Sequence, residues 1–274
     1  MSGTRAHIIG GAERAGVVRH GIVARMLHGV LAYYPLLLIA VLWEALTAAG
    51  IIGTDVLPRL DAVLVAIWRG LTGTTLLVDT GISLFRVLAG LAAGLGIGIA
   101  LGVLTGLSRR WDAYVSPLLI GSQAFPRSAL LPLFIVWFGL GEFEKLVVIT
   151  SVAFFPVFIN TYEGLKRVNV QHIWSARAMG YRPAGILLAV QLPSTLPYIM
   201  SGIRIAAPTS VTMMVVAEMV GARSGLGQLV ITAGQSYRFP EMFAGVVLLG
   251  VVGLLVHALI NMSDRLAIPW NTGP

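Results

Sequence analysis

The sequence predicts an all-α membrane protein with six transmembrane helices, and its composition and its apolar runs support this fold class. Apolar residues make up 57% of the chain and charged residues only 11%, whereas an ordinary soluble domain has roughly 25% charged residues. The mean hydropathy is +0.86. Several apolar runs approach or exceed the length of about 20 residues that a helix needs to cross a bilayer. Little of the chain remains for a separate soluble domain.

The order of apolar and polar segments predicts the elements. Residues 1–28 are polar and basic and are expected to form a cytoplasmic arm, followed by a transmembrane domain at 29–270 and a tail at 271–274. The first apolar run spans about 28 Å as a helix, which favours a retained membrane span over a cleaved leader. The expected spans lie near residues 30–49, 83–107, 113–138, 145–162, 196–220 and 242–262.

The distribution of lysine and arginine predicts the orientation. With the N-terminus inside, eleven of these residues fall in segments expected inside and five in segments expected outside. This asymmetry follows the positive-inside rule, and six spans then place both termini in the cytoplasm. The net charge of +7 is scattered between apolar runs. We therefore interpret it as a topology signal and not as a nucleic-acid-binding surface.

The second expected span carries a glycine at every fourth position. Residues four apart share one face of a helix, so these glycines predict a groove into which another helix packs closely. A sliding or hinge surface is the alternative. The ladder consists of Gly90, Gly94, Gly98, Gly102 and Gly106.

The third, fourth and fifth expected spans contain prolines, which are expected to bend these helices around a central space. They are Pro117, Pro126, Pro132, Pro156 and Pro208.

A polar and basic interruption at residues 163–195 separates the fourth span from the fifth and is expected in the cytoplasm. Asn169 suits the N-cap of a helix that starts at Val170, and Gly180 suits the left-handed residue that ends it. Pro183 suits the first turn of a second short helix. Pro193 and Pro197 are expected to end that second helix before the fifth span.

This interruption is more elaborate than a connection between two spans requires. A helix, a glycine corner and a second helix indicate an element that a cytoplasmic partner grips. The small side chains of Ser175, Ala176 and Ala178 would let the groove of a partner close around the first helix.

Charges inside spans require an explanation, because a charge at the bilayer centre costs about 2.5–3.5 kcal/mol. Arg127 follows Pro126 in the third span. It is either a structural residue paired with a freed carbonyl or with Glu44, or a cation that lines a path for an anionic solute. Glu218 in the fifth span is either the partner of an arginine such as Arg86 or Arg223, or part of an outer gate.

The sequence contains no signal for catalysis or for a metal site. It has no cysteine, which excludes disulfides, iron–sulfur clusters and thiolate metal sites. The histidines are dispersed and no His-Glu-x-x-His or Gly-x-Ser-x-Gly occurs. We therefore expect no catalytic, cofactor-binding or metal-binding residues, and no enzyme.

The spacing in the cytoplasmic interruption resembles the EAA loop of permease subunits from binding-protein-dependent ABC importers. That loop has Glu-Ala-Ala, a glycine four residues after the second alanine, and a Leu-Pro about thirteen residues further on. Here Trp174-Ser175-Ala176 occupies the positions of Glu-Ala-Ala. Gly180 matches the glycine, and Leu192-Pro193 matches the Leu-Pro. The departures are Trp174 for the glutamate and Ser175 for the first alanine.

The resemblance extends from about residue 43 to 270. Within this family, the chain is similar to the branch that includes the permeases for taurine, alkanesulfonates and nitrate. The stretches that carry the similarity are LFRVLAGLAAGLGIGIALGVLTGLSRR, LPLFIVWFGLGE and AEMVGARSGLGQLV.

The resemblance implies a type I ABC importer permease fold with a cytoplasmic coupling helix, in the inner membrane of a bacterium. It implies a cytoplasmic ATPase dimer, a periplasmic or lipid-anchored solute-binding protein and a second permease subunit, expected as a homodimer. The solute would be a small organic or inorganic anion such as a sulfonate or nitrate. The residues expected to couple to the ATPase are Trp174, Ser175, Ala176, Arg177, Met179, Gly180 and Pro193.

The resemblance also assigns the nucleotide to the partner. The only lysines, Lys145 and Lys166, do not lie in a Gly-x-x-x-x-Gly-Lys phosphate loop, so ATP and magnesium would be bound by the partner ATPase. The third and fifth spans are expected to line the translocation path. The candidates for that path are Arg127, Pro126, Glu218 and Met213, although packing explains the methionine equally well.

A secondary transporter or channel that needs no ATPase is the main alternative. Such proteins are often built from internal repeats with broken helices in corresponding halves. The sequence shows no convincing repeat, which favours the importer.

Overall fold

The computed structural model describes residues 34–35, 38–122 and 126–268. The expected N-terminal arm at 1–28 and the tail at 271–274 lie outside the described residues. The chain divides into two compact units, residues 1–63 and 64–274. In the first unit a helix covers Leu38–Ala48, and its Trp43 donates a hydrogen bond from Nε1 to the carbonyl of Pro58 at 2.8 Å.

The described residues are mostly helical and contain no strand, which confirms the all-α fold class. The helices after the first one are α2 (Leu60–Thr72), α3 (Thr75–Leu107), α4 (Arg109–Ser122), the 3₁₀ turn η1 (Arg127–Leu130), α5 (Leu131–Phe138), α6 (Glu142–Lys166), α7 (Val170–Ala178), α8 (Pro183–Ile186), the π-helical segment η2 (Leu187–Gln191), α9 (Leu192–Gly221), α10 (Leu226–Gln235) and α11 (Phe239–Ala267).

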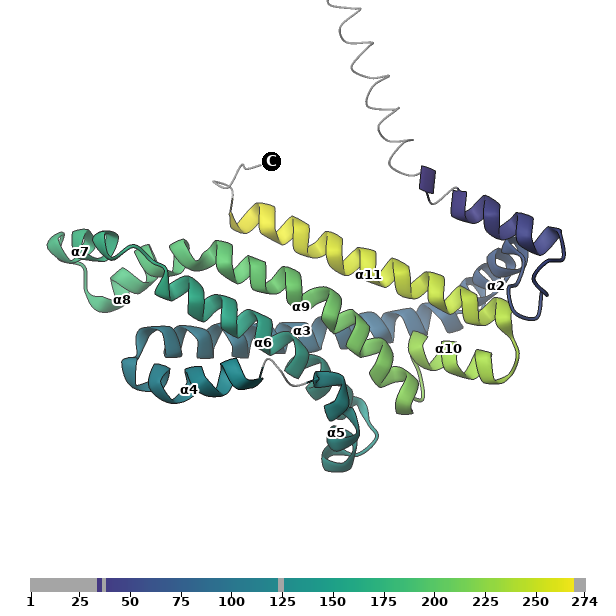
Figure 1. Ribbon diagram of the computed structural model, residues 1–274, viewed down its shortest axis with the longest axis horizontal. Helices are drawn as coiled ribbons and strands as arrows, with labels where there is room; N and C mark the ends of the chain where they lie inside the picture. The colour runs from purple at the N-terminus through teal and green to yellow at the C-terminus, as the bar shows by residue number, and fades with distance from the viewer. Residues whose placement is uncertain (1–33, 36–37, 123–125, 269–274) are drawn as a thin grey trace, which may run out of the picture. The chain divides into compact units, whose positions relative to one another are not determined.

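Helix α6 packs between α3 and α9 and forms the centre of the second unit. Figure 1 shows these long helices side by side, with α11 along α9, with α7 and α8 at one end and with α10 at the other. Buried side chains of α3, α6, α9, α10 and α11 make up the main apolar core. Its members include Val87, Leu91, Ile149, Val157, Ala206, Met214 and Val252.

The glycine ladder of α3 is the surface against which α6 packs. A Cβ placed on Gly94 would lie 2.6 Å from the Cβ of Ala153, and one on Gly98 would lie 3.0 Å from the carbonyl oxygen of Phe154. Gly90 is equally close to Ile149 on α6. The expected close packing is confirmed, because only residues without a side chain let the two backbones approach this far.

Three helices are long and apolar enough to cross a membrane, judged by length and composition among the described residues. These are Thr75–Leu107, Pro183–Gly221 and Phe239–Ala267. The second expected span therefore starts earlier than residue 83. The first expected span lies partly outside the described residues, so the count of six spans stays a prediction.

The third expected span is not one continuous helix, and this expectation was wrong. Among the described residues of this range, residues 113–122 form the end of α4, Arg127–Leu130 form the turn η1 and Leu131–Phe138 form the short helix α5. Pro126 has an extended backbone with ψ of 103° where the chain enters η1. A proline and the residue before it are both poorly compatible with the helix interior, so Pro126 breaks the span where we expected a bend.

The expectation that Pro193 and Pro197 end a second short helix was also wrong. Helix α8 continues through the π-helical segment into α9, with Pro193 in the first turn of α9 and Pro197 inside it. At the junction the amide of Leu192 bonds to the carbonyl of Leu187, five residues earlier. The wider π turn rearranges the hydrogen bonds where Pro193 has no N–H to donate, so the helix continues past both prolines.

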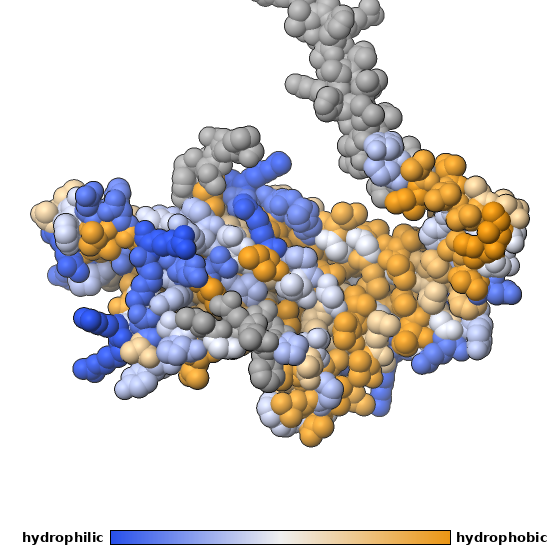
Figure 2. Space-filling view, viewed as in Figure 1, coloured by the Kyte–Doolittle hydropathy of each residue, from blue (hydrophilic) through white to orange (hydrophobic). Residues whose placement is uncertain are grey.

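The surface of the described helices changes character along their length. Figure 2 shows hydrophilic residues gathered at the end that carries α7 and α8, and apolar residues over the middle. Large exposed apolar side chains of the middle section include Ile205, Val246, Leu254 and Leu255. This distribution suits a bundle whose middle faces lipid.

Candidate functional site

The helix α7 begins as its sequence predicts. Asn169 is the N-cap, with an extended backbone, and its side-chain oxygen accepts a hydrogen bond from the amide of Gln171 at 2.9 Å. This bond satisfies one of the free amides at the helix start.

The end of α7 is a Schellman motif centred on Gly180. The φ of Gly180 is +83°. Its amide donates to the carbonyl of Arg177 at 3.0 Å, and the amide of Tyr181 donates to the carbonyl of Ala176 at 3.1 Å. These two bonds cap the last carbonyls of the helix. A Cβ on Gly180 would meet no atom within 4 Å. The glycine is therefore needed for its backbone conformation and not for space.

The predicted coupling residues of α7 lie mostly on its surface. Trp174 is 61% exposed and Met179 70% exposed, and Ser175, Arg177 and Gly180 are exposed as well. Ala176 is 1% exposed and faces the protein. Pro193 lies apart from them, half-buried in the first turn of α9. The surface offered by α7 thus consists of an indole, a thioether and an arginine beside a glycine corner.

A polar contact links the end of α6, next to α7, to the start of α4. Lys166 donates to Asp112 at 2.6 Å, and the hydroxyl of Tyr162 donates to the other carboxylate oxygen at 2.6 Å. The hydrogen bond from Lys166, followed by that from Tyr162, lowers the pKa of Asp112. The contribution of this carboxylate to stability is complete above its ordinary pKa and is lost as the pH falls through the lowered value.

The path candidates lie in different surroundings. Pro126 and Arg127 lie at the break between α4 and α5, and the side chain of Arg127 lies outside what the structure describes. Met213 is 5% exposed and packs with Leu131 and Val148. Glu218 has no exposed surface. No described contact joins these four residues to one another, and the path role of each stays a prediction.

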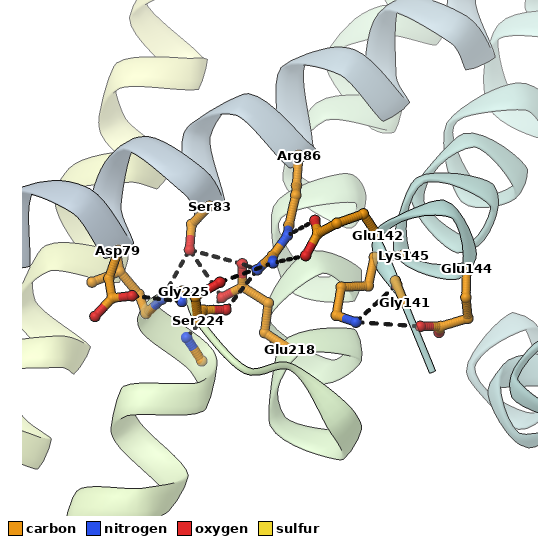
Figure 3. A network of polar contacts seen from close by, with 12 residues as sticks. Asp79, Ser83, Arg86, Gly141, Glu142, Glu144, Lys145, Glu218, Ser224 and Gly225 are labelled. Carbon is orange, nitrogen blue, oxygen red and sulfur yellow. Dashed lines mark hydrogen bonds and ion pairs between the residues drawn. The ribbon is translucent and has the colours of Figure 1, made fainter. Parts of the chain in front are cut away.

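Glu218 belongs to a buried polar group that we call the Arg86 network (Figure 3). Its members are Asp79, Ser83, Arg86, Glu142, Glu218 and Ser224. The guanidinium of Arg86 is completely buried and donates from Nη1 to Glu218 at 2.7 Å and to the carbonyl of Ser224 at 2.7 Å. Its other two nitrogens bond to Glu142. The predicted pairing of Glu218 with Arg86 is confirmed.

The same carboxylate and its neighbours hold the loop between α9 and α10. The amide of Gly227 donates to Glu218 at 2.8 Å, that of Leu226 to the hydroxyl of Ser83 at 2.9 Å, and that of Gly225 to Asp79 at 2.7 Å. A Cβ on Gly225 would lie 2.5 Å from the carboxylate of Glu218. The close approach therefore requires glycine, and the φ of +111° favours it too.

The sequence did not single out Asp79, Ser83, Glu142 or Ser224 as members of this network. Their partners lie more than fifty residues away along the chain in most cases, and local patterns carry no information about such distances. The Ser-Gly-Leu-Gly turn that comes after Glu218 was the one available signal. Lys145, the first residue of the fourth expected span, is buried, and it donates to the carbonyl of Gly141 at 2.9 Å.

The described residues contain no group of three His, Asp or Glu that could hold a metal ion. The two arrangements that the structure does show are an exposed capped helix at one end of the bundle and a buried network at the other.

Comparison with known proteins identifies relatives over most of the chain. Residues 94–269 match the family described as binding-protein-dependent transport system inner membrane component. The chain is 32% identical to the aliphatic sulfonates transport permease protein SsuC of Bacillus subtilis, over 86% of this chain and 85% of the relative. It is also 32% identical to the formylaminopyrimidine transport permease protein ThiX of Halalkalibacterium halodurans, over 85% and 93% of the two chains.

The fold is also similar to a solved structure. A chain of the MetNI methionine ABC transporter, in an inward-facing conformation, superposes with a TM-score of 0.61 and 24% sequence identity. The match covers 72% of this chain and 97% of that chain. At this identity the similarity concerns the fold alone, and it agrees with the arrangement of the long helices.

Proposed function

Because this chain belongs to the family of binding-protein-dependent transport system inner membrane components, we propose that α7 and its glycine corner receive the force of the ATPase. The chain is a multi-pass ABC importer permease of the inner membrane, and a separate subunit hydrolyses ATP. ATP and magnesium belong to that ATPase subunit, which forms a dimer on the cytoplasmic side. A solute-binding protein delivers the solute from the other side.

One observation supports this assignment of α7 above all others. The segment that occupies the EAA position is a helix capped at both ends, and it presents Trp174 and Met179 to solvent at one end of the bundle. An exposed apolar surface of this kind is typical of a protein interface. The contact of Lys166, at the end of α6 just before α7, with Asp112 connects the neighbouring part of the chain to α4.

The solute of this permease is a small anion. Two observations support this choice: relatives are named for aliphatic sulfonates, and Arg127 lies in the broken third span. The path runs between two copies of the chain, and Arg127 and Pro126 line it. Glu218 and Met213 hold the helices around it. Both termini lie in the cytoplasm, as the distribution of positive residues favours.

Reconstitution tests the proposal. The permease is placed in liposomes with its ATPase and its solute-binding protein, and uptake of labelled alkanesulfonate, nitrate and formylaminopyrimidine is measured together with ATP hydrolysis. We expect uptake of one anionic class that requires both ATP and the ATPase. Uptake that persists without either would favour a secondary transporter and contradict the proposal.

Variants of one arginine test the path. Arg127→Gln should lower uptake of the anion and leave the basal ATP hydrolysis of the complex unchanged. Arg110→Gln, an exposed arginine on α4, serves as the matched control and should change neither. Equal uptake in all three proteins would remove Arg127 from the path.

A further inference from the structure

The segment around α7 carries positive charge only. Between Glu163 and Glu218 the sequence contains no aspartate or glutamate, and within this stretch it has five basic residues other than histidine, namely Lys166, Arg167, Arg177, Arg182 and Arg204. Three of these have carboxylate partners within the chain. Lys166 bonds to Asp112, Arg167 lies 3.4 Å from Glu163, and Arg204 pairs with Asp264.

The two remaining arginines flank the Gly180 corner. Arg177 lies in the last turn of α7, and Arg182 is the N-cap residue of α8. Both are exposed, and neither side chain has an ion pair or hydrogen bond with the residues that the structure describes. Two positive charges are therefore available to a partner at the point where the chain turns.

Apolar side chains lie next to these charges. Trp174 is 61% exposed and Met179 is 70% exposed, and Tyr181, beside the corner, is 49% exposed. Tryptophan, methionine, tyrosine and arginine are the residue types enriched in protein interfaces, and buried tryptophan and arginine often supply most of the binding energy. The arginine fork also suits a carboxylate, which it can bind through two hydrogen bonds.

We infer that the groove of the ATPase that receives α7 is acidic, with carboxylates facing Arg177 and Arg182 and an apolar pocket for the indole of Trp174. This inference rests on the proposed function and specifies the chemistry of its partner surface. The EAA loop has a glutamate at the position of Trp174, and a glutamate there would pair with a cation in the groove. Here such a cation would face two arginines of like charge, which costs binding energy.

Binding of the ATPase subunit to the permease in nanodiscs of neutral lipid tests the inference. We expect the affinity of the parent protein to fall as salt rises, because salt screens charge pairs at an interface. Arg177→Gln and Arg182→Gln should each weaken binding about three- to tenfold and flatten the salt dependence. The matched control Arg110→Gln, which removes the same charge from an exposed position on α4, should bind as the parent does.

The position of Trp174 provides the most selective variant. Trp174→Glu should weaken binding at least tenfold, since it places a carboxylate in an acidic groove, and Trp174→Phe should weaken it less. Tighter binding of Trp174→Glu would show a basic groove and overturn the inference.

Three further outcomes distinguish the acidic groove from the proposed function. Binding that is independent of salt and unaffected by Arg177→Gln and Arg182→Gln would overturn the acidic groove and leave the proposed function standing. If salt dependence and the effect of the two variants occur only when anionic lipid is included, the arginines bind headgroups and the inference fails. Absence of any binding by the parent protein would overturn the proposed function itself.

Discussion

Arg86 combines full burial with a permanent charge, so its partners decide whether its place in the bundle is stable. Its guanidinium has two carboxylates and one carbonyl within hydrogen-bond distance, and Glu218, the partner on α9, is equally buried. Without the carboxylate of Glu218, the buried guanidinium would keep only one charged partner, Glu142, whose side chain is 64% exposed, and breaking a buried ion pair in this way costs more than the pair contributes.

We therefore expect Glu218→Gln to destabilise the protein by about 3 kcal/mol, since the carboxylate also accepts bonds from Ser83 and Gly227. The midpoint of thermal unfolding in detergent measures this change. Glu241→Gln is the control, because Glu241 pairs with Arg238 on the surface and should contribute less than about 1 kcal/mol. Equal midpoints for the two variants would contradict the structural role of the network.

Gly180 has a different requirement, which concerns backbone conformation alone. Its φ of +83° is costly for a residue with a Cβ, by about 1–2 kcal/mol, and most of all for a β-branched one. Gly180→Val should therefore distort the corner after α7 and uncouple uptake from ATP hydrolysis, measured as solute transported per ATP. Gly180→Asn should preserve coupling, because asparagine tolerates the left-handed conformation. Normal coupling in Gly180→Val would refute this role.

At the residue scale the sequence predicts the features that local geometry determines. The cap at Asn169, the left-handed Gly180 and the first-turn Pro183 are all confirmed. The pairing of Glu218 with Arg86 was one of two options, since a buried carboxylate needs a cation and the chain offers few. Asp79 and Glu142 were not predicted, because their partners come from distant parts of the chain.

At the scale of elements, the contact of α3 with α6 depends on the absence of side chains along one face. The ladder was predictable because its period of four matches the helix. The break in the third span and the π turn before α9 were not predicted in this form. A proline signals a defect in a helix, but whether the helix breaks, bends or widens depends on the packing around it.

Substitutions of two glycines in α3 measure the effect of packing against α6 separately from the effect of helix propensity. Gly94 faces α6, and a Cβ there would lie 2.9 Å from the carbonyl oxygen of Thr150, whereas Gly96 faces open space. We expect Gly94→Ala to destabilise the protein by about 1–3 kcal/mol, because α3 and α6 must move apart. Gly96→Ala should be neutral or stabilise it by up to about 1 kcal/mol. Thermal unfolding in detergent compares them, and a stable Gly94→Ala would argue against the close contact.

At the scale of the whole molecule, the candidate coupling surface and the Arg86 network lie at opposite ends of the same long helices, because α7 lies between the end of α6 and the start of α9, whereas Glu142 begins α6 and Glu218 lies near the end of α9. Figure 1 shows α7 at one end of these helices. Interdigitated helices move as packed units, since a close-packed interior transmits displacement. Lys166 and Asp112 connect the end of α6 to α4, and the Arg86 network holds α3, α6 and α9 together at the far end.

The side of the membrane on which α7 lies was predicted from charge counts alone. Composition indicated the class of protein, because the high mean hydropathy and the low charged fraction are typical of membrane proteins. It could not indicate the number of spans, which depends on the relative placement of broken and short helices such as α4 and α5.

The most direct test uses the fact that the chain has no cysteine. Met179→Cys and Tyr237→Cys each introduce one thiol at an exposed position, the first next to Gly180 and the second, 81% exposed, between α10 and α11. Labelling with a membrane-impermeant thiol reagent is compared in intact cells and in inverted vesicles, with and without the bound ATPase. We expect Met179→Cys to react only in inverted vesicles and to be shielded by the ATPase, and Tyr237→Cys to react only in intact cells. Labelling of Met179→Cys in intact cells, or its unchanged labelling when the ATPase is bound, would contradict the account.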